Sequence, residues 1–469
     1  MSPEMDERIA RAMEDIRSET AFQGRWGPPH ALAERMAYFH TPGIGLALVE
    51  GFEVAWAGGF GYRQADNDEP VTSGTLFQAA SISKPVMALA VMRLVQDGLL
   101  DLDHDVNDYL TSWRVPANDG WQPRITLRQL LSHTAGVTVH GFPGYAANEP
   151  MPSLAQVLEG DPYANTPCIE VNILPGLTGR YSGGGSLIAQ QVLVDRLGKP
   201  FPQLMREVVF GPLEMHDSSF DQPLPPAWAA RAATGHPYKG VPLPGRYHVY
   251  PELAAAGLWT TPTDLALVGL ELMRAATGRP SMLLSRETAE AMLQPQHADS
   301  GAGYRPALGF FLRGDGDARF FYHPGWNEGF VAHAQFFPAT GQGHVVMLNS
   351  NEGNDLMFDI GRALHRELGW PGDLPAERTP VDVVAPERFV GTYATGSGMP
   401  LRVSVLAGIL HLQAGTQPPL PMYASAPLEY FSRALNTTLA FRQDEAGAIT
   451  GLALEQEGQT FEAERSTHP

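Results

Sequence analysis

The stretch Ser81-Ile82-Ser83-Lys84, continued by Pro85-Val-Met-Ala-Leu-Ala-Val-Met-Arg-Leu-Val95, decides the fold of this chain. Its apolar run predicts a helix that is apolar on nearly every face, and such a helix belongs inside a protein. Ser81 and Lys84 then lie three residues apart on the first turn and face the same way. A serine hydroxyl is a poor nucleophile until a base takes its proton, and a lysine amine is such a base only where burial or nearby positive charge lowers its pKa. The pattern therefore predicts a candidate Ser–Lys pair for nucleophilic chemistry.

Lysine is rare in this chain, which carries only Lys84, Lys199 and Lys239 against 29 arginines. Arginine stays protonated in proteins and cannot act as the base. A short Ser-x-x-Lys pattern also arises by chance in a chain of this length. Taken alone, the pair is equally compatible with a serine that caps a core helix and a lysine that extends to solvent.

The composition is that of a folded, acidic protein. The chain has 469 residues, of which 43% are hydrophobic, and a net charge of −19. This length predicts two domains, and the acidic balance argues against a nucleic-acid partner because it repels phosphate. No apolar run reaches transmembrane length, and the polar start Met1–Arg8 lacks the pattern of a signal peptide. We therefore expect a cytoplasmic protein with no membrane partner.

The single cysteine, Cys168, excludes an internal disulfide. It lies in the extended-looking segment Asn165–Glu170. A lone cysteine is more often a small buried apolar residue than a reactive thiol, and we expect it to be buried here.

Strand patterns lie at both ends of the first 370 residues, and helical patterns lie between them. The predicted strands are 43–49, 53–60, 307–312, 319–322, 330–337 and 344–348, and the predicted helices include 5–18, 127–132, 186–197, 202–209, 262–276 and 355–368. The economical solution is an α+β fold with one antiparallel sheet built from both ends of this region, helices on its faces and a helical lobe beside it.

The chain changes character after residue 370. Four prolines within 371–386 mark a linker. Short strands follow at 391–394, 401–406, 409–413, 420–423, 429–432, 437–442, 449–455 and 460–464. Eight short strands bounded by turn residues predict a small antiparallel barrel. The predicted organisation is a domain at 1–372, a linker at 373–385 and a barrel domain at 386–469.

Two further motifs contain groups that suit a Ser–Lys site. In Arg180-Tyr181-Ser182-Gly183-Gly184-Gly185, the tyrosine precedes a glycine-rich turn, and a nearby lysine cation would help its phenol to release a proton. In His323-Pro-Gly-Trp-Asn-Glu-Gly-Phe330, between two predicted strands, an imidazole adjoins flexible backbone whose N–H groups can bind an oxyanion. The alternatives are a helix entry with a packed tyrosine and a hairpin turn.

One histidine, His133 in Leu130-Leu-Ser-His-Thr-Ala-Gly136, also suits a general base. We expect instead that it caps or braces the end of a helix. Other chemistries lack support, because the chain contains no G-x-S-x-G elbow, no H-E-x-x-H, no paired Cys/His spacing, no P-loop and no dinucleotide fingerprint. No metal and no cofactor are therefore expected.

These residues, in this order, resemble the penicillin-recognising serine hydrolases, which include class C β-lactamases, D,D-peptidases, D-aminopeptidases and related esterases. The resemblance covers about residues 30–370. Its further landmarks are Gly59–Tyr62, Phe77–Ser81, Leu130–Gly136, Pro212–Met215, Gly257–Asp264 and Val346–Asn349. It implies the β-lactamase/penicillin-binding-protein fold, and the tail resembles the lipocalin-like barrel that some of these enzymes carry.

The resemblance also implies roles for individual residues. Ser81 would be the acylated nucleophile, and Lys84 would be its base or would tune the base. Tyr181 would be the general base and later the acid to the leaving group. Backbone N–H groups of Ser81 and Trp326 would form the oxyanion hole.

The chain departs from the family pattern at two positions. Gly183 stands where the family's Tyr-x-Asn has its asparagine, and His323 stands where its Lys-Thr-Gly has its lysine. Gly183, Gly325 and Trp326 are the implied substrate-binding positions. His323 is predicted as a catalytic residue together with Ser81, Lys84 and Tyr181, because it can still hydrogen-bond the Tyr181 phenol. Both departures remove groups suited to β-lactams and C-terminal carboxylates.

The sequence is therefore compatible with three candidate functions. The first is a serine hydrolase that cleaves ester or peptide-like amide bonds of a small substrate, which can contain D-residues. The second is a β-lactamase or a penicillin-binding D,D-peptidase. The third is a non-catalytic binding or regulatory protein that keeps the fold and holds a ligand in its barrel. The sequence does not indicate the oligomeric state.

Overall fold

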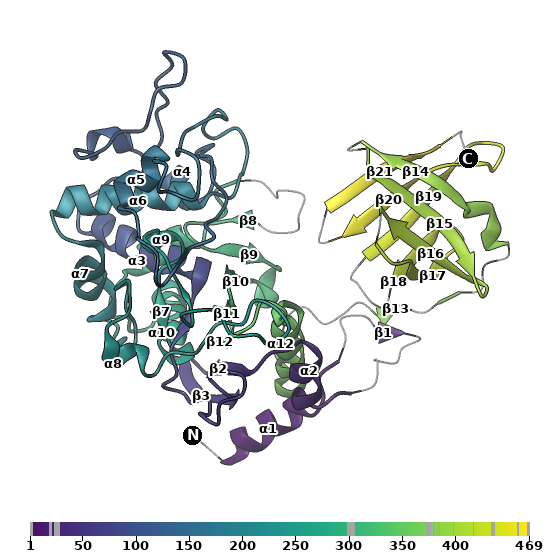
Figure 1. Ribbon diagram of the computed structural model, residues 1–469, viewed down its shortest axis with the longest axis horizontal. Coiled ribbons are helices and arrows are strands. Elements are labelled where there is room, and N and C mark those ends of the chain that lie inside the picture. Colours follow the sequence, from purple (N-terminus) through teal and green to yellow (C-terminus); the bar gives the residue numbers. More distant parts are fainter. Residues whose placement is uncertain are drawn as a thin grey trace. The chain divides into compact units, whose positions relative to one another are not determined.

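The computed structural model describes residues 3–17, 21–22, 29–297, 305–371, 377–378, 380–381, 383, 385–396, 398–415, 417–432, 437–456 and 459–466. The chain divides into two compact units. The first contains the described residues of 1–11, 32–300 and 304–372, and the second those of 12–31 and 373–469. Figure 1 shows helices around a central sheet in the first unit and a barrel in the second.

The first unit is built on a seven-stranded sheet in the described chain, with the order β3-β2-β12-β11-β10-β9-β8. Every neighbouring pair is antiparallel. The strands are β2 (Gly43–Glu50), β3 (Glu53–Gly61), β8 (Arg305–Pro306), β9 (Phe311–Arg313), β10 (Phe320–Asn327), β11 (Phe330–Phe337) and β12 (Gln342–Leu348). The strands from the start of this region therefore join those from its end, and the predicted α+β architecture is confirmed.

Helices cover both faces of the sheet. The helices are α1 (Pro3–Met13), α2 (Leu32–Tyr38), α3 (Ser83–Gln96), α4 (Leu127–Leu131), α5 (Leu154–Glu159), α6 (Gly183–Leu197), α7 (Phe201–Met205), α8 (Pro226–Ala229), α9 (Leu253–Ala256), α10 (Pro262–Ala276), α11 (Arg286–Met292) and α12 (Asn354–Leu368). A Cβ atom on Gly269 of α10 would lie 2.3 Å from the Phe336 ring, and one on Gly361 of α12 would lie 3.1 Å from His344 Nε2. Phe336 pairs with Gly343 across β11 and β12, so these two residues face the same side of the sheet. His344 follows Gly343 and therefore faces the opposite side. Helices α10 and α12 thus pack on opposite faces.

Short strand pairs complete the two units. In the first unit β4 (Phe77–Gln78) pairs with β7 (Trp259–Thr260), and β5 (Tyr145–Ala146) pairs with β6 (His248–Val249). In the second unit β1 (Ala21–Phe22) pairs with β13 (Glu377–Arg378). The β4–β7 pair fixes the chain directly before the Ser81 region.

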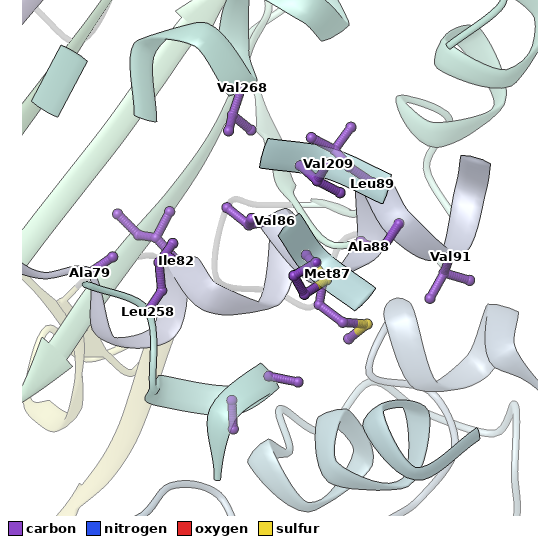
Figure 2. Close-up of a cluster of buried hydrophobic side chains, with 14 of the residues drawn as sticks. Ala79, Ile82, Val86, Met87, Ala88, Leu89, Val91, Val209, Leu258 and Val268 are labelled. Carbon is purple, nitrogen blue, oxygen red and sulfur yellow. The ribbon is translucent and has the colours of Figure 1, made fainter. Parts of the chain in front are cut away.

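Helix α3 runs through the main core. Its residues from Ser83 to Met92 are all buried, as predicted from an apolar run with no polar face. Val86, Met87 and Leu89 lie among buried side chains of other segments, including Leu258 and Val268 (Figure 2). Lys84 therefore stands on a buried helix, and Ser81 lies just before that helix rather than on its first turn as predicted.

The second unit contains a closed antiparallel barrel, as predicted. Its strands follow one another in sequence, and β14 pairs with β21 to close it. They are β14 (Gly391–Thr395), β15 (Pro400–Leu406), β16 (Ile409–Ala414), β17 (Leu420–Ala426), β18 (Glu429–Ser432), β19 (Thr437–Gln443), β20 (Ile449–Gln456) and β21 (Gln459–Arg465). Phe389, Tyr393, Tyr430 and Phe441 pack with aliphatic residues in its core.

Two motifs differ locally from their predicted conformation. The glycines at 183–185 form the first turn of α6 rather than a turn before it, because the Ser182 side chain caps the helix by accepting the Gly185 N–H. Residues 323–327 of the third motif belong to β10 rather than lying between strands, and the turn before β11 is confined to Glu328 and Gly329. Pairing with β9 ends at Tyr322, so β10 has a strand neighbour on one side only beyond that point and tolerates Pro324.

The expectation of a buried cysteine is wrong. Cys168 is exposed, whereas its neighbour Ile169 is buried. Ile169 N–H donates to the Leu158 carbonyl at 3.0 Å, which holds this segment extended against the first unit. Alternate residues of an extended segment point in opposite directions, and Ile169 rather than Cys168 takes the inward position.

Candidate active site

Ser81 lies on the 3-10 turn Ala80–Ile82, which we call the nucleophile turn, directly before α3. Ala80 has a φ of +50°, a left-handed conformation that costs a residue with a Cβ atom free energy. Hydrogen bonds hold the turn in place: Ser83 Oγ donates to the Ala80 carbonyl at 2.6 Å and accepts from the Leu258 N–H at 3.0 Å. The Ser81 side chain is therefore presented by a fixed backbone and remains half-buried rather than enclosed.

Lys84 contacts the Ser81 hydroxyl. Its Nζ atom lies 2.9 Å from Ser81 Oγ and donates to the Ala255 carbonyl at 2.8 Å. Only 4% of Lys84 is exposed. Burial disfavours the charged amine and lowers the pKa of Lys84 to about 7. Near neutral pH a large fraction of Lys84 is therefore uncharged and able to accept the Ser81 proton.

Tyr181 lies over Lys84, directly before α6. The Lys84 Nζ atom is 4.9 Å from the centroid of the Tyr181 ring. The ring also contacts two imidazoles, with centroid distances of 4.3 Å to His133 and 4.9 Å to His140. Ser182 ties the following backbone to His133, because its N–H donates to His133 Nδ1 at 3.2 Å. Tyr181 is therefore held within reach of the Ser–Lys pair.

His133 lies where a bracing residue would lie. Its Nδ1 atom accepts the Ser182 N–H, so that atom is not available to a substrate. Burial, the Lys84 charge and His140 lower the pKa of His133 to about 3. A neutral imidazole with an occupied ring nitrogen suits a brace better than a base.

His140 was not singled out from the sequence. Burial and the charge on Lys84 lower its pKa. Its carbonyl accepts the Gly183 N–H at 2.9 Å, so its backbone is tied to the first turn of α6. It lies in a segment without a recognisable motif, and only the fold brings it beside Tyr181.

His323 is buried in β10, with 1% of its surface exposed. Its Nδ1 atom lies 2.6 Å from the Pro324 carbonyl, which can only accept, so Nδ1 carries the proton. The ring stacks on Phe311 at a centroid distance of 5.2 Å. Burial and the Lys84 charge lower the pKa of His323 well below its usual value, so the ring is neutral.

The expected hydrogen bond between His323 and Tyr181 is not formed. His323 Nδ1 is directed to its own neighbour Pro324, and Nε2 has no hydrogen-bond partner among the described residues. The two rings lie 6.2 Å apart between centroids. His323 therefore contributes to the wall of the site and stacks there, rather than holding the phenol.

The glycine positions let backbones meet at the site. A Cβ atom on Gly325 would lie 2.4 Å from the Ala79 carbonyl oxygen, so β10 packs directly against the nucleophile turn. Trp326 follows with 51% of its surface exposed. A Cβ atom on Gly183 would lie 2.8 Å from the Phe142 ring, so a larger side chain would displace this buried ring.

The short helix α9 connects the parts of the site. Its Ala255 carbonyl accepts from Lys84, and its Ala256 carbonyl accepts from Asn327 Nδ2 at 3.0 Å. Asn327 Nδ2 also donates to Gln78 Oε1 at 2.8 Å. The sequence analysis missed these roles, although α9 directly precedes the landmark Gly257–Asp264 and Asn327 lies within the third motif.

A third hydrogen bond joins α9 to α6, the helix that follows Tyr181. The Ala254 N–H donates to Gln190 Oε1 at 2.8 Å, and Gln190 belongs to α6. Helix α9 is thus hydrogen-bonded to three elements. Helix α3 carries Lys84, helix α6 follows Tyr181, and strand β10 carries His323. The position of α9 therefore couples the three predicted motifs.

The comparison with protein families agrees with this arrangement. The model of the family described as Beta-lactamase matches residues 30–367, which is most of the chain. The chain belongs to the beta-lactamase family. Members of this family share a serine-hydrolase fold, and the Ser81, Lys84 and Tyr181 cluster lies within the matched residues. The beta-lactamase family match ends before the barrel.

Individual relatives extend the comparison. Penicillin-binding protein 4* of Bacillus subtilis (strain 168) is 21% identical over 446 residues, which cover 90% of this chain and 94% of that protein. Esterase EstB of Burkholderia gladioli is 39% identical over 85 residues, which cover 18% of this chain and 22% of that protein. The octameric penicillin-binding protein homologue from Pyrococcus abyssi is similar in structure, with a TM-score of 0.62 and 20% identity over 92% of this chain and 98% of that chain. This likeness shows the fold.

The helices were also compared with the length of a bilayer. None of the described helices has both the length and the apolar character that a membrane crossing requires.

Proposed function

We propose that this chain is a serine hydrolase that cleaves ester bonds or peptide-like amide bonds of small substrates through an acyl-enzyme on Ser81. The observation that carries the proposal is the 2.9 Å contact between Lys84 Nζ and Ser81 Oγ. The lysine is buried, and its pKa is lowered to about 7. A base with a pKa near the working pH is the most effective partner for a hydroxyl nucleophile.

The first half of the reaction forms the acyl-enzyme. Uncharged Lys84 takes the Ser81 proton as Oγ attacks the substrate carbonyl. Backbone N–H groups of Ser81 and Trp326 bind the oxyanion that develops. Tyr181 passes the proton to the leaving alcohol or amine, and the acyl group stays on Ser81. In the second half, water attacks the ester, loses its proton to the same groups and releases the acid.

The walls of the site favour an uncharged acyl group. His323 is neutral and buried at the position of the family's usual cation. The Phe142 ring occupies the space beside Gly183 that a side chain would need. A carboxylate on the substrate would therefore lack the fixed cation that recognises it in relatives. Esterase EstB, which matches part of this chain, carries a name consistent with ester substrates.

A second candidate is a β-lactamase or a penicillin-binding D,D-peptidase. It is favoured by penicillin-binding protein 4*, whose match covers 94% of that protein. The neutral His323 and the bare Gly183 argue against it. Turnover of nitrocefin at a rate comparable with ester hydrolysis would favour this candidate over the first.

The third candidate, a binding protein that holds a ligand in its barrel, has less support. The barrel core is packed with the side chains of Phe389, Tyr393, Leu439 and Phe441. A small barrel filled in this way has its interior occupied by its own residues.

The test is release of p-nitrophenol from p-nitrophenyl butyrate by the wild type, Ser81→Ala and Ser404→Ala. Ser404 is a half-buried serine of β15, so its loss controls for the substitution itself. Turnover by the wild type and Ser404→Ala, with none by Ser81→Ala, would support the proposal. Full activity of Ser81→Ala would refute the site. If the wild type hydrolyses neither esters nor a panel of L- and D-peptides, the proposed function is wrong.

A further inference from the structure

Glu252 is a buried carboxyl group that the proposed reaction does not use. It directly precedes α9 and has no exposed surface. Both carboxyl oxygens lack a hydrogen-bond partner among the described side chains and backbone groups. Buried polar groups in proteins are almost always hydrogen-bonded, so an exception calls for an explanation. A carboxylate in such a place is strongly disfavoured, whereas a protonated carboxyl costs far less.

Burial outweighs the one group that favours a negative charge on Glu252, which is its own backbone N–H. A negative charge on Glu252 would raise the pKa of Tyr145 on β5 and that of Tyr250. A negative charge on Glu328 also raises the pKa of Tyr250. Among the elements packed against α9, α3 brings Lys84, whose Nζ is bonded to Ser81 and Ala255, and α6 follows Tyr181. No described arginine or lysine forms an ion pair with Glu252. Ionisation would therefore place a charge without an ion-pair partner near two phenols.

The helix that Glu252 precedes holds the site together. Three successive residues of α9 are hydrogen-bonded to Gln190 of α6, Lys84 of α3 and Asn327 of β10. A buried charge is relieved when the group moves toward water. Because α9 is only four residues long, a shift of Glu252 would move the Ala255 carbonyl that holds Lys84.

We propose that Glu252 is a positioning residue that must keep its proton for α9 to hold Lys84 against Ser81, so that its ionisation switches the hydrolase off in alkaline solution. This inference rests on the proposed function. Glu252 touches neither the substrate nor the reacting atoms. It acts through the backbone of α9.

The two buried groups then define the window of activity. Lys84 must lose its proton to act as a base, and its pKa lies at about 7. Glu252 must keep its proton, and burial raises its pKa to about 8. Activity should rise as pH increases through 7 and fall as pH increases through 8. A bell-shaped profile of this kind reports two groups with opposite requirements.

The test compares the pH profiles of the wild type, Glu252→Gln and Glu271→Gln on p-nitrophenyl butyrate, with the product quantified at one fixed pH. Glutamine cannot ionise. Glu271 of α10 is also buried, but its side chain accepts the N–H groups of 282, 283 and 284, and it serves as the matched control. A merely structural role would change the rate by one factor at every pH.

The expected result is a change in the shape of the profile. Two ideal titrations at 7 and 8 predict that the ratio of the rate at pH 9.5 to that at pH 7.5 rises by about 25-fold in Glu252→Gln. The ratio should be unchanged in Glu271→Gln. An alkaline limb that is the same in Glu252→Gln and the wild type would overturn the inference while leaving the proposed function intact. If the wild type shows no turnover that depends on Ser81, that result would instead count against the proposed function.

A second readout needs no catalytic activity. Unfolded glutamate releases its proton near 4.5, but folded Glu252 does so only near 8, so folding takes up a proton between these values. The wild type should therefore lose thermal stability relative to Glu252→Gln as pH rises from 5 to 8. A melting-temperature difference that stays constant over this range would also overturn the inference.

Discussion

The two units of this protein have cores of opposite character. The first buries ionisable groups such as Lys84, Glu252, His323 and His333, all less than 5% exposed. In the described part of the second unit, the buried polar residues are Ser432 and Thr437, and aromatic and aliphatic side chains make up the rest of the core. Burial is what shifts the pKa of an ionisable group. The first unit therefore buries groups whose pKa values burial can shift, whereas the described core of the barrel is mainly apolar.

We expect the largest effect on activity when the proposed nucleophile of the first unit is removed. Ser81→Ala should lower ester turnover by about 10³-fold or more, because the reaction loses its nucleophile. The melting temperature should stay within a few degrees of the wild type, since Ser81 is half-buried on a turn held by other residues. Steady-state rates and thermal melts check both points. Residual turnover above a tenth of the wild-type rate would place the nucleophile elsewhere.

Lys84→Arg should reduce acylation by about 10²- to 10⁴-fold, the usual contribution of a positioned base. Arginine keeps a positive charge but does not give up its proton at neutral pH. Single-turnover kinetics with p-nitrophenyl butyrate measure the acylation step. Half or more of the wild-type rate in this variant would mean that Lys84 acts as a fixed charge and not as a base.

Tyr181→Phe should cost about 10²-fold or more in acylation, deacylation or both. The variant keeps the ring that packs between Lys84 and His133, and it removes only the hydroxyl. Burst kinetics separate the two half-reactions. If both rates stay within threefold of the wild type, proton transfer does not pass through this phenol.

In the barrel, Phe441→Ala should lower the free energy of unfolding by about 3–5 kcal/mol, as for other large-to-small changes in a core. Phe441 is 4% exposed and stacks on Phe389 at 4.2 Å. The turnover number at 25 °C should remain within twofold of the wild type. Urea unfolding and ester kinetics on the same samples test this contrast. A large loss of activity without a loss of stability would show that the barrel has a direct part in the reaction.

The fold could be predicted from the sequence to a large extent because its signals are local. The apolar run after Ser81 predicted a buried helix, and short strands bounded by turn residues after residue 386 predicted the barrel. Pro324 and Gly325, which follow His323, were predicted to lie between two strands. The structure places both in β10, where only one side of the strand needs its backbone donors.

The site could be predicted only in part. Ser81, Lys84 and Tyr181 come together as the order of the motifs indicated. The orientation of His323 depends on one hydrogen bond to the next residue, which no pattern encodes. Glu252 has the residue type that is usually exposed, and only the packing around α9 shows that it is buried.

We expect the smallest effect from a histidine cluster on the face of the sheet that α12 covers. His333, His344 and His365 are buried and in contact there, and burial lowers the pKa of His333 to about 3 and that of His365 to about 4. The unfolded chain binds these protons near 6.5, so folding stability is lost as pH falls below that value. His365→Phe should reduce the loss of stability between pH 7 and pH 5 by about 2 kcal/mol. An unchanged pH dependence of urea unfolding would show that His365 is not held neutral.

The central claim is that burial turns Lys84 into a base. Because the chain has only three lysines, a protein labelled with ¹³C at lysine Cε gives three NMR signals, and Lys84→Met identifies the one from Lys84. The account predicts that this signal titrates with a midpoint near 7 in the folded protein. A midpoint above 10 would show a lysine that stays charged at neutral pH, and it would contradict the account.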